Sequence, residues 1–177
     1  MSTIRILKAY KAFLKDVVAT TIKLKKPDDD NTETYELVNP QVHIGWIPPK
    51  GYLPPEMESA MPCLIVQMDE ADTNAQSADI KIRISFAVWS PGTYLPEENG
   101  GVDYTPDFDG YIDLINLIDR TVDELVRNRV IGDVTTVQLP IKYGMYAEQP
   151  YPYWYGWITF TTSGQPKLFT KDIQKLL

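Results

Sequence analysis

The stretch ADIKIRISFAVW, residues 78–89, decides the fold. A period of two in its apolar positions is that of a β-strand with one face in a core and the other face polar. The preceding run CLIVQM, residues 63–68, predicts a short buried strand, and the polar linker DEADTNAQS, residues 69–77, predicts that the two strands form a hairpin. The alternating apolar positions are Ile80, Ile82, Ile84, Phe86 and Val88.

Two segments nearer the C-terminus predict the rest of the sheet. Thr135–Leu139 and Ile141–Tyr143 are extended pieces that we expect to act as one strand around Pro140. Tyr153–Thr162 is the last predicted strand. Its alternation places Trp154, Gly156, Ile158 and Phe160 on one face and Tyr155, Trp157, Thr159 and Thr161 on the other.

An amphipathic helix is predicted at the N-terminus, where apolar residues recur at three- and four-residue spacing and lysines fill the opposite face. Ser2 or Thr3 can cap its start, and Pro27 with the acidic run Asp28–Asp30 ends any continuation. The predicted apolar stripe is Ile4, Leu7, Tyr10 or Lys11, Leu14, Val17 and Val18, widened by Ile6 and Phe13.

A second amphipathic helix is predicted after Asp107 or Asp109, either of which can cap it. Arg127 and Arg129 lie favourably near its C-terminal end, and Ile131–Gly132 closes it. Its apolar stripe is Tyr111, Leu114, Ile115, Leu117, Ile118, Val122, Leu125 and Val126.

Residues 27–61 and 90–109 are predicted to be long loops. Prolines exclude a long helix from the first, although short extended pieces are plausible at Thr34–Val38 and Val42–Ile47. In the second, Gly100-Gly101 is a flexible point. Long loops in a compact domain are usually functional or mobile.

The order of elements predicts an α+β fold: a mainly antiparallel β-sheet packed by two helices on one face, with long loops. The 177 residues fit one domain, which we place at residues 1–165, with a C-terminal tail at residues 166–177.

The net charge of −7 is distributed unevenly. Residues 1–26 carry seven basic side chains against one acidic, residues 27–110 carry sixteen acidic against three basic, and the rest are balanced. Because phosphates repel an acidic chain, tight nucleic-acid binding is disfavoured. The split suggests that copies of the chain could meet through complementary fields. Ordinary solvated faces explain it equally well.

The single cysteine, Cys63, can form no intrachain disulfide, which suits a reducing cytosol. No apolar run approaches the roughly 20 residues of a membrane-spanning helix. Lysines interrupt the N-terminal segment, where a signal peptide needs an unbroken apolar stretch. We therefore expect a soluble protein, made in the cytosol, that contacts no membrane.

The sequence gives little support for a catalytic or metal-binding site. A nucleophilic dyad or triad would have to use His43, the one histidine, and Cys63 opens an apolar strand where a buried, inert thiol is the default. One Cys and one His cannot build a structural zinc site. The acidic strings at residues 28–33 and 103–110 lack the spacing of a calcium loop, and no phosphate-binding loop is present. We predict no catalytic residue, metal or cofactor.

The aromatic cluster Tyr151–Trp157 is the most unusual feature of the sequence. Tryptophan and tyrosine are enriched at subunit interfaces, which favours an interface. A strand whose outer aromatics cover a neighbouring strand explains the cluster as well. A stacking platform for sugar or single-stranded nucleic acid is a third interpretation.

In its order of motifs the chain resembles the tail-terminator family of tailed bacteriophages, also called tail-completion or head–tail joining proteins. The matching features are an N-terminal helix, a strand led by Pro62, an alternating strand ending in a polar turn at Ser90, a helix led by Asp109-Gly110, and a final strand pair through Pro140 to Trp157. The resemblance covers most of residues 1–165. Residues 27–61 form a longer segment than the leanest members have.

The resemblance implies a homohexameric ring that caps the tail tube, ends tail elongation and presents a face to the head connector. Its partners would be copies of itself, the tail tube protein and a head-completion protein. DNA would pass through the lumen without specific binding, and the protein would be found in the virion after assembly in the bacterial cytoplasm.

The expected contact residues follow from that ring, with the segments 69–77 and 90–107 as the expected ring-to-ring contacts. The interface candidates are Tyr94, Tyr104, Tyr151, Tyr153, Tyr155, Trp157, Asp69 and Glu70, and the candidate acidic lumen is Asp28, Asp29 and Asp30.

Two other functions stay open at this point. The chain could be another phage structural subunit, such as a tube or head-completion protein. It could also be a carbohydrate-binding module that uses the Tyr151–Trp157 cluster.

Overall fold

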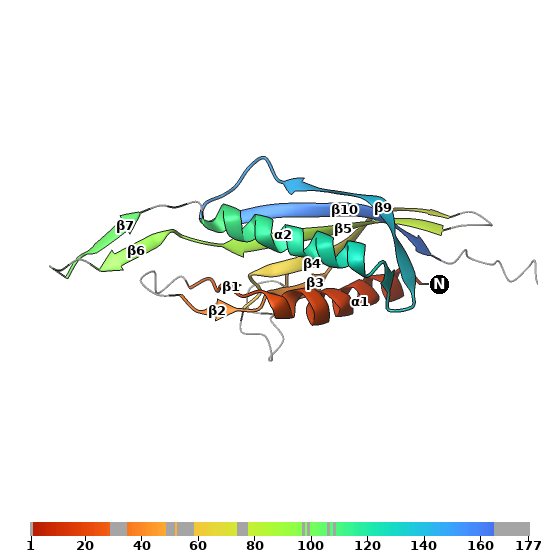
Figure 1. Cartoon of the computed structure of the whole chain (residues 1–177), viewed down its shortest axis with the longest axis horizontal. Coiled ribbons are helices and arrows are strands. Elements are labelled where there is room, and N and C mark those ends of the chain that lie inside the picture. The colour runs from red at the N-terminus through yellow and green to blue at the C-terminus, as the bar shows by residue number, and fades with distance from the viewer. Residues whose placement is uncertain are drawn as a thin grey trace, which may run out of the picture.

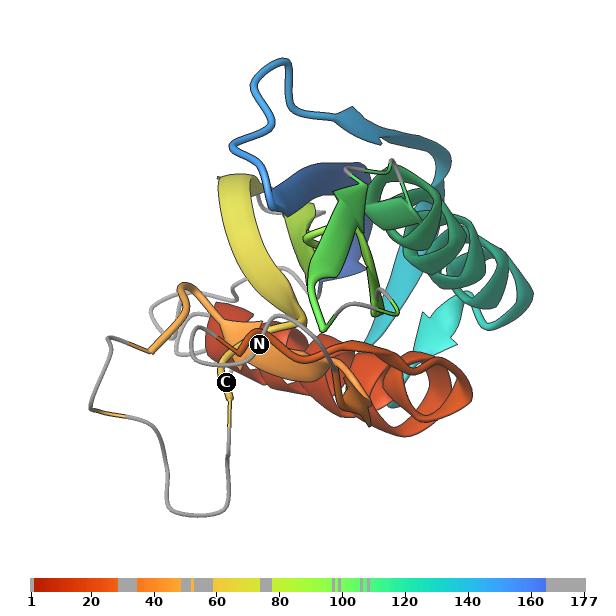
Figure 2. The ribbon, with the colours of Figure 1, turned by 90° about the vertical axis from the view of Figure 1, so that its left-hand side faces the viewer.

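The computed structural model describes residues 2–28, 35–48, 52, 59–73, 78–96, 98, 100–105, 107 and 109–164. They form the predicted α+β fold: a curled, mostly antiparallel β-sheet with two helices (Figures 1 and 2). Neither described helix is long and apolar enough to cross a lipid bilayer.

The main sheet has six strands in the order β3-β4-β5-β10-β9-β8. Neighbouring strands are antiparallel except β3 and β4, which run parallel. β5 occupies the centre and pairs with β10 along its whole length, from Trp89 opposite Tyr153 to Ala78 opposite Gly164. The strands are β3 (Gln41–Ile44), β4 (Cys63–Thr73), β5 (Ala78–Trp89), β8 (Val130–Ile131), β9 (Thr135–Met145) and β10 (Tyr153–Gly164); a separate pair is β1 (Leu24–Lys25) with β2 (Leu37–Val38).

The helices α1 (Thr3–Phe13) and α2 (Asp109–Arg127) pack on the same side of the sheet, as predicted (Figure 2). α1 packs against β3, β4 and β8, and it continues into a π-helical turn (Leu14–Val18) and a 3-10 turn (Ala19–Thr21). α2 packs most closely on β10. Its start is capped by Asp107, whose Oδ1 accepts a hydrogen bond from the backbone N of Asp109 at 3.1 Å.

One hydrophobic core lies between the helices and the sheet. It combines Ile6, Tyr10 and Leu14 of the first helical segment with Leu114 and Ile118 of α2 and the inward residues of the strands. The inward strand residues include Leu64, Val66, Ile80, Ile82, Ile84, Phe86, Val88, Trp154, Ile158 and Phe160.

A chain of buried hydroxyl groups ties α1 to the sheet. The phenolic oxygen of Tyr10 lies 2.8 Å from Thr162 Oγ1, which lies 2.6 Å from Thr135 Oγ1 and donates to the Thr136 carbonyl at 3.0 Å. Burial raises the pKa of the Tyr10 phenol, so it stays protonated and able to donate. These contacts satisfy polar groups that would otherwise be costly in an apolar core.

The predicted helix stripes were wrong at their margins. Ile4 is 49% exposed and Val17 is only partly buried, whereas Ile6, Leu7 and Tyr10 of the predicted stripe are buried in the core. In α2, Tyr111 and Val126 are exposed, and Thr121 takes a buried position. Thr121 is accommodated because its hydroxyl donates to the Leu117 carbonyl at 2.7 Å.

The segment 90–109 contains a hairpin where a loop was predicted. β6 (Thr93–Pro96) and β7 (Val102–Thr105) pair antiparallel as a separate two-stranded sheet, which we call the hairpin arm. The arm projects from one end of the body (Figure 1). Its prolines and glycines conceal the strand pattern in the sequence.

The root of the hairpin arm is held by three separate contacts. Lys25 Nζ donates to Ser90 Oγ at 2.8 Å, and both side chains are buried. The backbone N of Ser90 donates to the Pro152 carbonyl at 3.0 Å, and the Tyr151 hydroxyl donates to the Pro91 carbonyl. These contacts hold the chain at Ser90 and Pro91, just before the arm begins.

The linker predicted at residues 69–77 was also wrong in part, because β4 continues through it to Thr73. Residues 69–73 are mostly exposed and polar, so no apolar alternation marks them as a strand. Their pairing with β5 is interrupted by a register shift between Met68 and Glu70.

β9 crosses Pro140 as one continuous strand, as predicted, with a register shift against β10 between Thr159 and Thr161. Among the described residues, β8 and the adjoining Arg129 cover the outer edge of β9 only up to Val137. The outer edge from Leu139 to Met145 faces no described strand.

Candidate functional site

The candidate site is the side of the six-stranded sheet that neither described helix covers, which we call the open face. The alternation of β10 defines it: Trp154, Gly156 and Ile158 point to the helices, so Tyr155 and Trp157 point the other way. Facing residues of β4 and β5 build the rest of this surface.

Aromatic rings and one ion pair organise the middle of the open face. Tyr153 and Tyr155 stack with their ring centroids 6.4 Å apart and an interplanar angle of 11°. The guanidinium of Arg83 lies 5.9 Å from the Trp157 ring and forms a two-pronged salt bridge with Asp69 at 2.8–3.1 Å. The hydrogen bonds that Arg83 donates to Asp69 raise the pKa of the Arg83 guanidinium.

At one end of the open face is a groove of about 490 Å³, which we call the apolar groove. Trp46, 74% exposed, and Ile47 form one wall, and Tyr146 lies on the segment that follows β9. Gln149 fixes that segment, since its side chain bonds the backbone of both Tyr146 and Tyr155 at 2.6–2.9 Å. The remaining lining residues are Ile65, Gln67, Ser85, Phe86, Ala87 and Glu148.

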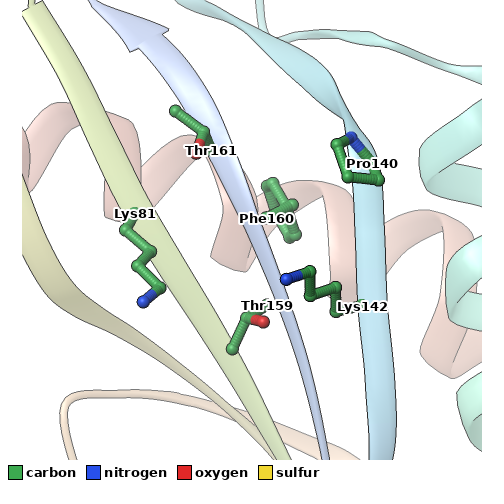
Figure 3. A pocket seen from close by; sticks show the side chains of 6 residues that line it. All are labelled: Lys81, Pro140, Lys142, Thr159, Phe160 and Thr161. Atoms are coloured by element: carbon green, nitrogen blue, oxygen red, sulfur yellow. The ribbon is translucent and has the colours of Figure 1, made fainter.

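The other end of the open face is polar and holds two adjoining hollows. The first, of about 310 Å³, has Lys81 and Lys142 on the strands flanking β10, with the Thr159 hydroxyl between them (Figure 3). The second, of about 360 Å³, is lined by Glu70, Asp72, Asp79, Lys81, Gln138 and Thr161. The open face therefore changes from apolar to charged along the strands.

The structure brings most of the predicted interface residues together. Tyr153, Tyr155, Trp157, Asp69 and Glu70 all lie on the open face. Asp69 forms a salt bridge with Arg83, whereas Glu70 lines the second of the two polar hollows.

The other predicted residues lie elsewhere. Tyr151 is at the root of the hairpin arm. Tyr94 and Tyr104 are directly opposite each other in the arm, at the register of β6 and β7. Of the candidate acidic lumen, Asp28 is exposed just after β1, and Asp29 and Asp30 lie outside the described residues.

Sequence reasoning missed Trp46, Ile47 and Tyr146, which line the apolar groove, and the lysine pair of the polar end. Trp46 reaches the groove because β3 pairs in parallel with β4, so that Gly45 N donates to the Val66 carbonyl at 2.9 Å. A parallel pairing between such distant segments leaves no local signal. The one available hint was a tryptophan beside a glycine in a proline-rich segment.

Cys63 and His43 do not form a reactive pair. Cys63 is fully buried, and burial raises its thiol pKa to about 12, so the thiolate is strongly disfavoured. His43 stands opposite Ile65, and its Nε2 lies 3.0 Å from the Ala60 carbonyl, to which it donates as a neutral ring. Burial, the largest cause, lowers the pKa of His43.

We expect Cys63 to be unreactive in the folded protein. At pH 8 a thiol with a pKa of about 12 has almost no thiolate, and no solvent reaches the sulfur. Titration with a chromogenic disulfide reagent should label less than about a tenth of the protein without denaturant and one thiol per chain in 6 M guanidinium, a concentration at which most domains are unfolded. Fast labelling of native protein would show that β4 opens or that the burial is wrong.

Within the described residues, no group of three His, Cys, Asp or Glu side chains is placed to hold a metal ion. No protein-family model matches the chain, and no curated protein matches its sequence.

Proposed function

We propose that the chain is a structural virion protein that forms a ring, caps the tail tube, ends tail elongation and joins the tail to the head connector. Support comes from the resemblance in element order to tail terminators and from the surfaces that the chain leaves available. In this proposal no residue is catalytic. The protein acts by differential binding: one of its faces binds the end of the tail tube, and the other face does not bind further tube protein.

The open face is the observation that carries the proposal. Large exposed apolar surfaces on a protein mark interaction sites. Here a groove with Trp46, Tyr146 and Tyr155 lies beside an ion pair and a charged end, which is the mixture of aromatic core and polar rim found at interfaces. A stable interface buries roughly 1,600 Å² in total, and a six-stranded sheet face can supply one partner's share.

The apolar groove gives a specific prediction. Trp46→Ala should weaken association between copies by roughly 30-fold, the effect expected for an aromatic anchor at the centre of an interface. Sedimentation velocity across a concentration series measures the change. Ile112→Ala is the matched control, since Ile112 is 56% exposed on α2, on the helix side of the sheet. Equal effects of the two substitutions would argue against the groove.

The ring itself is tested by electron microscopy of the purified protein alone and with polymerising tube protein. We expect rings alone or on tube ends, and tubes that stop growing when the protein is added. Filaments of the chain would instead favour a tube protein, and binding to a head connector without any effect on tube growth would favour a head-completion protein.

An acidic lumen that lets DNA slide is part of this proposal, with Asp28, Asp29 and Asp30 as its candidates. Reversing these three charges and finding unchanged DNA passage in assembled particles would remove their role.

The apolar groove also supports one alternative, a carbohydrate-binding module, because sugars stack on exposed aromatic rings. Trp154 cannot contribute to such a platform, since it is buried under the start of α2. Glycan-array binding that is lost in Trp46→Ala and in Tyr155→Ala would favour this alternative over the ring.

A further inference from the structure

The hairpin arm is a two-stranded sheet separate from the six-stranded sheet. β6 and β7 pair only with each other among the described strands, and the arm extends beyond the body (Figure 1). A lone two-stranded hairpin is only marginally stable in water. Since its root is fixed by Lys25, Tyr151 and Pro152, the arm is positioned to lie on a surface outside its own body.

The charge of the arm limits which surface it can use. The stretch from Thr93 to Thr105, which contains both strands of the arm and their connection, has three carboxylates and no basic residue. Glu98 is exposed at the turn, and Asp103 lies in β7 opposite Leu95. Such a segment is attracted to a basic surface and is repelled by the acidic remainder of the molecule.

The exposed side of α1 provides a basic surface of this kind. Arg5 and Lys8 of α1 and Lys15 of the π-helical turn that continues it, with Ala12 between them, are spaced three, four and three residues apart and are exposed, so they form one stripe. Nowhere in the described part of the chain do these three cations have an acidic partner. Ile4, 49% exposed, adds apolar surface at the start of this basic stripe.

We propose that the hairpin arm of one copy docks on the basic stripe of α1 in a neighbouring copy. Within one copy the two surfaces lie apart, because the arm points away from the body and α1 lies along it (Figure 1). The contact joins two different surfaces, and repeated contacts of this kind close into a ring when the rotation between copies allows it. The inference thus rests on the proposed ring and names the contact between its neighbours.

Charge reversal in both surfaces tests this contact. Arg5→Glu with Lys8→Glu makes the stripe acidic, and Glu98→Lys with Asp103→Lys makes the arm less acidic by four charge units. Each double variant should self-associate about tenfold less well or worse, and the loss should shrink at high salt because exposed charges are screened. The two double variants mixed in equal amounts should assemble again, since each then offers the surface that the other lacks.

Mass photometry of the separate and mixed variants provides the measurement, and thermal melts confirm that all variants are folded. Arg120→Glu, a charge reversal on the exposed side of α2 and away from the basic stripe, is the control and should leave association unchanged. Rings from both variants at wild-type affinity would overturn the docking and leave the ring standing. Loss that mixing does not rescue, or loss only of tube binding, would also overturn it. A wild-type chain that forms no ring, alone or on tube ends, would remove the proposed function itself.

Discussion

Gly110→Ala is expected to lower the free energy of unfolding by about 1–3 kcal/mol, the usual cost of overpacking a core. A Cβ at Gly110 would lie 2.2 Å from Cδ1 and Nε1 of Trp154 and 3.0 Å from Ser90 Cβ. The indole is a rigid, buried ring and cannot give way as a flexible side chain would. The sign of this change distinguishes the clash from helix propensity, because alanine normally stabilises a helix by about 1 kcal/mol relative to glycine.

Urea unfolding followed by circular dichroism measures this difference. Asn116→Ala, an exposed position in α2, is the control and should change stability by less than about 0.5 kcal/mol. In a Trp154→Leu background the added cost of Gly110→Ala should largely disappear, because the atom that it clashes with is gone. A Gly110→Ala protein as stable as the parent would show that α2 does not start directly over Trp154.

Thr162→Val is expected to be at least as damaging, lowering the free energy of unfolding by about 2–4 kcal/mol because it leaves more than one buried polar group unsatisfied. Its hydroxyl is the meeting point for Tyr10, Thr135 and the Thr136 carbonyl, so the substitution leaves several buried polar groups without this partner. Each buried group left unsatisfied costs about 1–3 kcal/mol. Valine has nearly the same shape, so the loss reports the hydroxyl and little else.

The adjoining Thr161→Val is the matched control, because Thr161 points to the open face and is only partly buried. Its effect on denaturant unfolding should be below about 1 kcal/mol. Adding Tyr10→Phe to Thr162→Val should cost less than the sum of the single changes, since the two hydroxyls share one contact. Fully additive costs would show that the two groups do not bond in solution.

The pH dependence of stability has a defined sign at the same site. Burial raises the pKa of Tyr10 above its ordinary value of 10.0. A group whose pKa is raised on folding contributes stability below its unfolded pKa and loses it as the pH rises further. The folded protein should therefore lose stability above about pH 10, and Tyr10→Phe should reduce that loss.

The central strands could be predicted from the sequence because large apolar residues occupy every second position, which marks the face that packs in the core. β5 spans Ala78–Trp89 as predicted, and β10 extends only two residues past the predicted Thr162. Strict alternation of large apolar residues leaves one register in which a core can form. Apolar residues at helical spacing predicted the start of α2 for the corresponding reason. The predicted end at Ile131–Gly132 was wrong, because the helix ends at Arg127 and Val130–Ile131 form β8.

The prediction missed the strands that form through hydrogen bonds to a neighbouring strand and that carry no pattern of apolar residues. Residues 69–73 and the hairpin arm are polar, and their hydrogen bonds to a neighbouring strand are what make them strands. The candidate site was found only in part for a related reason: Tyr155 and Trp157 follow from alternation, but Trp46 joins them only through the pairing of β3 with β4. Such long-range pairings cannot be inferred from local sequence.

The part of the β9 border that no described strand covers has a consequence for how the free subunit behaves before it meets its partners. A bare strand border invites another chain to add on and so start uncontrolled aggregation. Pro140 lies near the start of this border and has no N–H to offer an incoming strand, and Lys142 puts a charge two residues further on. A molecule whose proposed task is to stop a growing polymer thus has residues that discourage it from seeding one of its own.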